Sequence, residues 1–203
     1  MSTGPAFIPA VLEYWFGSAD PAAPVPARTE MWFRGGADLD AEIADRFGAT
    51  LDALAAGHGE SWLKTPGGRL AYVVVLDQFS RHVYRGSPRA FHQDARALRA
   101  TLQGLEQGID RHYGLHQRAF FYLPLEHSED PAMQERSIEC YASLVEVART
   151  DDERRSADSY LRYAEEHRRI IERFGRYPHR NMVLGRTTTS DEWNYLRRPG
   201  AGF

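Results

Sequence analysis

The chain has 203 residues, of which 42% are hydrophobic and 26% are charged, and its formal net charge at pH 7 is -3. These values are typical of a folded globular protein and exclude a disordered or fibrous chain. We expect residues 1–203 to form a single domain around one core. Because acidic residues outnumber basic ones, the chain as a whole has no positive field that would attract nucleic acid.

The cysteine content and the short apolar runs indicate the cellular compartment of the protein. Cys140 is the only cysteine, so the chain can form neither an internal disulfide nor a thiolate metal cluster. Apolar runs stay below the roughly 18 residues that a membrane-spanning helix needs. Residues 1–10 lack the basic segment and long apolar run of a secretion signal. The sequence therefore predicts a cytoplasmic protein that does not enter a membrane.

The first part of the chain carries an apolar stretch over 8–16, ended by a glycine, and then a proline-rich loop over 21–26. Trp32 and Phe33 follow, and we expect both of them to anchor the core. Over 38–57, apolar residues recur every three or four positions until a glycine closes the pattern. This spacing predicts an amphipathic helix.

The stretch over 70–83 is ambiguous, because the three valines at 73–75 would suit a buried strand as well as a buried helix. Its length favours a helix, and no second β-rich segment is present to pair with a strand. Ser87 and Pro88 have the character of an N-cap and a first helical residue. They predict a further helix whose apolar stripe extends to Leu105.

The second half of the chain predicts four more helices. The first passes through 120–121 and is kinked or ended by Pro124, and an Asp-Pro pair at 130–131 begins the next. The longest helix follows the Asp-Asp pair at 151–152, reaches Phe174 and stops at a glycine. A capping box begins a short last helix within 189–200, which a Pro-Gly pair ends. Together the elements predict an all-α fold of stacked antiparallel helical hairpins.

Two ionisable residues interrupt an otherwise apolar helical face. In the segment LDQFSRHVYRG, which covers 76–86, Asp77 and Arg81 stand four residues apart and can form one ion pair. One interpretation is a structural salt bridge to a neighbouring helix. The alternative is that Arg81 binds an anionic ligand and that Asp77 positions it.

A second polar group follows the predicted break at Pro124, in the segment FFYLPLEHSE. Glu126, His127 and Glu129 lie within four residues there. A carboxylate beside an imidazole is the combination that acid–base chemistry near neutral pH uses. The structural alternative is that the two glutamates favour the positive end of the next helix dipole.

A third polar group joins the end of the longest helix to a loop, in the segment RFGRYPHRNMVLGR. Apolar residues in the same segment indicate that it packs inward, so its hydrogen-bond donors would face a cleft. These donors are Arg176, His179, Arg180 and Asn181. His167, on the apolar stripe of the longest helix, would face the same cleft or be a satisfied core residue.

The sequence resembles the domain of unknown function 924 family over nearly its whole length. The segments that carry this resemblance are VLEYWFG at 11–17, LDQFSRHVYRG, FFYLPLEHSE, RFGRYPHRN and PGAGF at 199–203. Ser80 and His82 depart from the proline and asparagine that are common in that family, so we expect less of a kink after Asp77. The resemblance implies a tetratricopeptide-like α–α superhelix with a concave face, and it implies no established activity. The closing motif leads us to expect Phe203 to pack against the domain.

We therefore favour a site for a small anionic ligand in a polar pocket between helices. Glu126 and His127 are its candidate catalytic residues. The candidate ligand-binding residues are Asp77, Arg81, Glu129, Arg176, His179, Arg180 and Asn181. This hypothesis would make the protein an enzyme, although no cofactor is indicated and the substrate is open.

The main alternative is an interaction scaffold whose concave face binds a peptide. A closed pocket of several hundred Å3 would favour the small-molecule site, and an open groove would favour the scaffold. A metal site built from His127, His167 or His179 with a nearby glutamate has no support in the spacing, because both HExxH and Glu-x-x-His are absent. The expected partner is a small molecule or a peptide, and neither nucleic acid nor a membrane.

Overall fold

The structure is a computed structural model that describes residues 4, 6–198 and 200–201. The regular secondary structure of these residues is entirely helical, without a strand, as predicted. The α-helices are α1 (Phe7–Phe16), α2 (Thr29–Arg34), α3 (Ala37–Ala55), α4 (Pro66–Val73), α5 (Ser80–Val83), α6 (Asp94–Glu106), α7 (Leu115–Glu126), α8 (Pro131–Val147), α9 (Asp151–Phe174) and α10 (Ser190–Leu196). Shorter helical turns are η1 (Trp62–Lys64), η2 (Val74–Phe79), η3 (Pro88–Phe91), η4 (Ile109–His112) and η5 (Pro178–Arg180).

Several helix ends are fixed by capping residues. Asp130 accepts a hydrogen bond from the amide of Ala132 and begins α8. Capping boxes begin α9 at Thr150 and α10 at Thr189, and Gly175 ends α9 in the left-handed conformation. Each cap pairs backbone groups that a helix end otherwise leaves unsatisfied. The last helix closes at Leu196, and the predicted boundary at Pro199 and the packing of Phe203 lie outside the described residues.

The ambiguous stretch over 70–83 is helical, which confirms the choice made from its length. The helix is not regular, because η2 between α4 and α5 is a π-helix. A π turn is wider than an α turn and is often found at functional sites. Asp77 lies within η2, and every residue of η2 is buried. The expected smaller kink after Asp77 concerns this same place, because the wider π turn ends just before Ser80.

Three expectations about the elements need correction. Ser87 does cap a helical turn, but that turn is the short η3, and α6 begins only at Asp94. Pro124 does not end its helix, because α7 continues to Glu126 with the proline buried inside it. Trp32 is buried and donates its indole N–H to the carbonyl of Trp15, at 2.9 Å. Phe33, in contrast, is 54% exposed and lies on the surface, stacked against Phe120.

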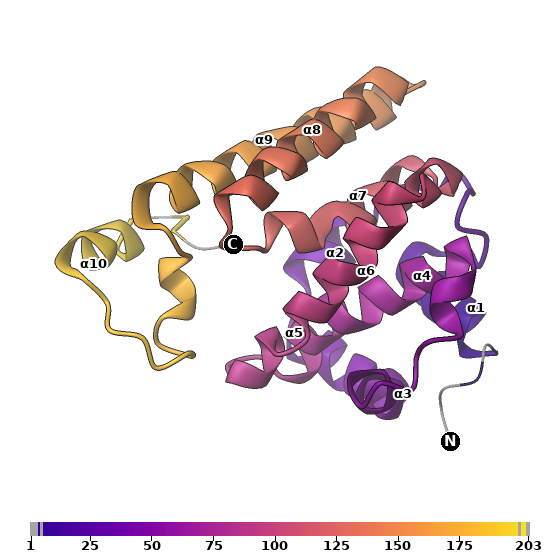
Figure 1. Cartoon of the computed structure of the whole chain (residues 1–203), viewed down its shortest axis with the longest axis horizontal. Helices are drawn as coiled ribbons and strands as arrows, with labels where there is room; N and C mark the ends of the chain where they lie inside the picture. Colours follow the sequence, from indigo (N-terminus) through magenta and orange to yellow (C-terminus); the bar gives the residue numbers. More distant parts are fainter. Residues whose placement is uncertain (1–3, 5, 199, 202–203) are drawn as a thin grey trace.

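The helices are arranged around one large apolar core, and a smaller apolar cluster lies beyond it. Figure 1 shows α8 and α9 side by side as a long hairpin, with α6 and α7 between this hairpin and the N-terminal helices. Aromatic rings of Trp15, Phe79 and Phe120 meet edge to face in the large core. The small cluster of Ile170, Ile171 and Tyr177 holds the segment after α9 against the end of α9. Among the described residues, no helix has both the length and the apolar character that crossing a membrane requires.

Replacing Gly68 with alanine is expected to destabilise the protein by about 1–3 kcal/mol, because a Cβ there would lie 2.2 Å from the backbone carbonyl oxygen of Trp62. Gly48 is a matched control, since it lies within α3 and a Cβ there meets nothing within 4 Å. The Gly48→Ala protein should be more stable by up to about 1 kcal/mol. Urea unfolding followed by circular dichroism measures both changes. Equal stability of the two variants would contradict the close approach of Gly68 in α4 to Trp62 in η1.

Candidate functional site

The three polar segments predicted from the sequence meet at one junction, where the C-terminal end of α7 lies between η2 and the segment after α9. Asp77 comes from η2, His127 follows α7, and Arg180 comes from η5. His127 bonds to Asp77, and the guanidinium of Arg180 lies close enough to lower the pKa of His127. The structure therefore brings together one residue from each of the three polar segments.

A buried carboxylate is the centre of the junction. Asp77 is 1% exposed, and one of its oxygens, Oδ1, accepts a hydrogen bond from Nδ1 of His127 at 2.8 Å. Its other oxygen, Oδ2, accepts one from the side-chain amide of Gln78 at 2.6 Å. Nη1 of Arg81 lies 3.3 Å from Oδ1. Burial alone would raise the pKa of Asp77, but Arg81 and His127 outweigh burial and hold this pKa below its ordinary value, so Asp77 is ionised.

The hydrogen bond to Asp77 fixes the tautomer of His127. Because an ionised carboxylate only accepts, Nδ1 of His127 carries the proton and Nε2 carries a lone pair. Nε2 makes no hydrogen bond with any described residue. Burial first, and then the charge of Arg81, lower the pKa of His127. His127 is therefore a neutral imidazole whose Nε2 is available to accept a proton.

Two arginines lie beside this pair. Arg81 donates two hydrogen bonds to the carboxylate of Asp94, at 2.9 and 3.0 Å, and a third to the backbone carbonyl of Asp77, at 2.7 Å. Arg180 is 7% exposed, and its guanidinium lies between the rings of Phe91 and Tyr177, at 4.9 and 4.5 Å from their centroids.

The side chain of Arg180 has few partners for a buried cation. Its nearest carboxylate oxygen, on Asp94, is 3.6 Å away, and its side chain makes no hydrogen bond within the described residues. Burial and the charge of Arg81 lower its pKa, while Asp94 opposes this. An arginine nevertheless stays protonated in proteins. Aromatic stacking therefore fixes the plane of a cation that still has N–H groups to donate.

Glu126 is the second buried carboxyl group of the junction. Burial, followed by the negative charge of Asp77, raises the pKa of Glu126 to about 8, so it is a neutral acid near pH 7. Its Oε1 lies 3.4 Å from Nδ1 of His167, which donates its proton to the carbonyl of Tyr163 at 2.9 Å. Burial lowers the pKa of His167 to about 3, so His167 is neutral as well. The carboxylate that bonds to His127 is therefore that of Asp77, and not that of its chain neighbour Glu126.

Arg186 organises the loop that carries Arg180, although it is not among the site residues predicted from the sequence. It donates hydrogen bonds to both oxygens of Glu129, to the side-chain oxygen of Asn181 and to the carbonyl of Tyr177. Glu129 also accepts the backbone N–H of Tyr177 at 2.8 Å. These bonds occupy Glu129 and Asn181, which therefore hold the loop in place and do not present free groups to a ligand.

Two predicted residues remain: His179 lies beside the junction, and Arg176 lies outside it. His179 is half-buried with its ring 5.6 Å from that of Tyr177, and burial followed by Arg180 lowers its pKa to about 4. Arg176 does not join the junction, because it donates to both oxygens of Glu192, at 2.7 and 2.9 Å. It ties the loop to α10, whose first turn carries Glu192.

Several residues at the junction gave no clear signal in the sequence. Asp94 begins α6 and resembles any acidic residue in a first helical turn, and Phe91 has the appearance of a core residue. Gln134 of α8 donates to the carbonyls of Glu126 and Ser128, and thereby closes the end of α7. Only tertiary contacts distinguish these side chains from ordinary helical ones. Tyr177 and Arg186 lie in the third predicted segment, where position alone could have suggested them.

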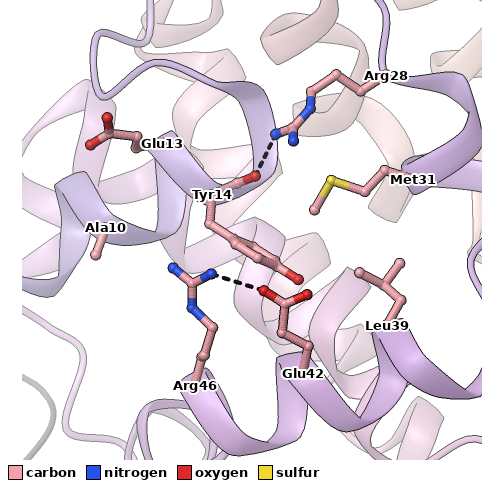
Figure 2. A pocket seen from close by; sticks show the side chains of 8 residues that line it. All are labelled: Ala10, Glu13, Tyr14, Arg28, Met31, Leu39, Glu42 and Arg46. Carbon is pink, nitrogen blue, oxygen red and sulfur yellow. Dashed lines mark hydrogen bonds and ion pairs between the residues drawn. The ribbon is translucent and has the colours of Figure 1, made fainter.

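The described residues contain no group of three or more histidine, cysteine, aspartate or glutamate side chains arranged to hold a metal ion. A pocket of about 690 Å3 lies away from the junction, among α1, α2 and α3 (Figure 2). A smaller hollow of about 300 Å3 lies on α10. Neither of these two hollows is lined by a residue of the polar junction.

Replacing Asp77 with alanine should lower the free energy of unfolding by about 3 kcal/mol or more, because Arg81 and His127 would both lose a buried partner. The control is Glu30→Ala, which removes an exposed partner of Arg34 and should change stability by less than about 1 kcal/mol. Urea unfolding measures both values. A near-neutral Asp77→Ala would contradict the buried position of this carboxylate.

Stability should also depend on the protonation of Glu126. A carboxyl group whose pKa is higher in the folded state stabilises the protein below its unfolded pKa, and this contribution is lost as the pH rises through the folded value of about 8. Glu126→Gln removes the titration, so this variant should become more stable relative to the parent between pH 5 and pH 8.5. Urea unfolding at each pH measures the difference. A constant difference across this range would show that Glu126 is ionised throughout.

Comparison with known proteins agrees with the fold and with the sequence motifs. A solved structure of a protein of unknown function from Agrobacterium tumefaciens is 34% identical to this chain, with a TM-score of 0.78, over 95% of this chain and 97% of that chain. No curated protein matches the chain. The family model described as "Bacterial protein of unknown function (DUF924)" matches residues 11–200. The chain therefore belongs to this bacterial family of unknown function.

Proposed function

We propose that the junction binds a small anionic ligand and that His127 moves a proton to or from it. The observation that carries this proposal is the buried Asp77–His127 pair, in which Nδ1 is held and Nε2 makes no hydrogen bond with a described residue. An orienting carboxylate on one ring nitrogen leaves the other nitrogen ready to act as a general base.

Arg180 is the proposed anchor for the negative charge of the ligand. Its guanidinium is stacked between two rings and has N–H groups without hydrogen bonds to described residues. Binding an anion there requires little reorganisation, because the side chain is already fixed. Arg81 supports it by neutralising Asp94, which would otherwise repel the ligand. Carboxylate and phosphate groups both fit the bidentate geometry of an arginine.

Glu126 is the proposed acid that complements the base. Its pKa of about 8 and the lowered pKa of His127 set the two neighbouring groups in opposite protonation states near pH 7. Two titratable groups whose pKa values are pushed apart in this way are suited to give and take protons in one reaction. His127 would accept a proton from the bound ligand at Nε2, and Glu126 would donate one to the atom where negative charge develops. Which bond of the ligand is cleaved or formed stays open.

A scaffold that binds a protein partner is the second candidate. It is supported by exposed apolar side chains near the C-terminus, with Met182 88% and Trp193 57% exposed.

Under either function we propose a single domain over 1–203 that forms a tetratricopeptide-like superhelix. The family match over 11–200 supports one domain, and the antiparallel α8–α9 hairpin supports an arrangement of stacked hairpins.

Anion titrations test the proposed site. Inorganic phosphate and acetate are added to 15N-labelled protein, and the imidazole nitrogen and arginine Nε signals are followed by NMR. We expect one of these anions to shift the signals of His127 and Arg180, and Arg180→Met to weaken this binding at least about tenfold, through loss of a charge-assisted contact. Arg173→Met is the matched control, because Arg173 forms an exposed ion pair with Asp191. Unchanged binding to Arg180→Met, or no shift at His127 with either anion, would refute the proposal.

The tautomer of His127 gives a separate test of its role. We expect 15N chemical shifts that show Nδ1 protonated and Nε2 unprotonated at pH 7 in the parent protein. In Asp77→Asn the acceptor for Nδ1–H is weakened, so the preference for this tautomer should be lost and anion binding at Arg180 should remain. A protonated Nε2 in the parent protein would contradict the base role.

A further inference from the structure

The pocket among α1, α2 and α3 is a second place where a ligand fits. It has a volume of about 690 Å3 and is lined by charged, aromatic and apolar side chains. Figure 2 shows Arg28 at its upper rim above Met31, with the ring of Tyr14, Leu39 and Glu42 below. None of these residues takes part in the junction of Asp77, His127 and Arg180, so the pocket is independent of the proposed function.

Arg28 is held in place on one side and is open on the other. Its Nη1 donates hydrogen bonds to the carbonyls of Tyr14 and Trp15, at 2.5 and 3.2 Å, in the last turn of α1. A guanidinium there satisfies carbonyls that the helix end leaves unpaired. Its Nε and Nη2 make no hydrogen bond with the described residues, and it belongs to none of their ion pairs. These two nitrogens form an edge that matches the two oxygens of a carboxylate.

The other charged side chains that line the pocket are Glu13, Glu42 and Arg46, and none of them forms an ion pair with Arg28. Glu42 pairs with Arg46 at 2.9 Å, and the guanidinium of Arg46 lies 4.3 Å from the centre of the Tyr14 ring. Burial, followed by Glu42, raises the pKa of Tyr14 to about 12, so the phenol adds no charge. Figure 2 shows Glu13 on the far side of Tyr14 from Arg28. The positive charge of Arg28 therefore has no carboxylate partner within the pocket.

We infer that this pocket binds a small organic acid whose carboxylate contacts the open edge of Arg28 and whose aliphatic group lies against Met31 and Leu39. A single fixed cation beside two flexible apolar side chains favours a monocarboxylate with a short apolar group. A phosphate ester is less suited, because it would bring two negative charges near Glu42 with only one unpaired cation.

A matched pair of ligands tests this inference. N-acetyl-L-leucine and its amide have the same apolar group and differ in the carboxylate. Each is titrated into 15N-labelled protein while the Nε–H signal of Arg28 and the backbone amides of α1 and α2 are followed by NMR. We expect the acid to shift these signals and the amide to bind at least about tenfold more weakly. Equal binding of the two, or no binding of the acid, would overturn the inference.

Two variants locate the binding. Arg28→Lys keeps the charge and one donor for the end of α1 but loses the second donor edge, so it should bind the acid at least about tenfold more weakly. Arg34→Lys is the matched control on the same helix, because Arg34 is exposed, pairs with Glu30 and does not line the pocket. Unchanged binding to Arg28→Lys would refute the site, and if that variant does not fold, the acid and amide comparison decides alone. His127→Ala should bind the acid normally, which separates this result from that at the junction.

Discussion

The carboxylate of Asp77 is the constraint on which the junction depends. It is buried in the widened turn η2, so it requires several donors, and these come from separate parts of the chain. His127 connects it to the end of α7, and Arg81 connects it to Asp94 of α6 and to the ring of Phe91. Arg180 forms an ion pair with the same Asp94, at 3.6 Å. One buried charge thus brings η2, α5, α6, α7 and η5 to one place.

The same constraint explains why the site was only partly predictable from the sequence. Asp77 and Arg81 stood out because ionisable side chains are rare on apolar helical faces. Glu126 and His127 stood out because they follow the predicted break at Pro124, and Arg180 because apolar residues in its loop indicate inward packing. Their pairing could not be predicted, since adjacency in the chain favoured Glu126 as the partner of His127, whereas the backbone brings Asp77 there. Asp94 and Gln134 lie at positions where polar residues are ordinary, so no local pattern distinguishes them.

The fold was more predictable than the site, because helix periodicity and capping are local properties. The start of α8 follows from Asp130 and the end of α9 from Gly175, whereas the capping box at Thr150 is known only from the structure. The errors arose where tertiary packing overrode local preference. Pro124 lies buried inside α7 and does not end it, and Phe33 is exposed although it follows the buried Trp32. His82, which departs from the family pattern, bonds to Asp40 at 2.7 Å and so joins α5 to α3.

The π-helical turn η2 has a consequence for the register of the residues that follow it. An α-helix advances by about 100° for each residue, and a π turn accommodates one residue more than an α turn. If one residue were missing from η2, the helix could continue as a regular α-helix, but Arg81 and His82 would rotate by about 100° and point away from Asp94 and Asp40. The direction of every side chain on α5 thus depends on a single additional residue in the helix before it.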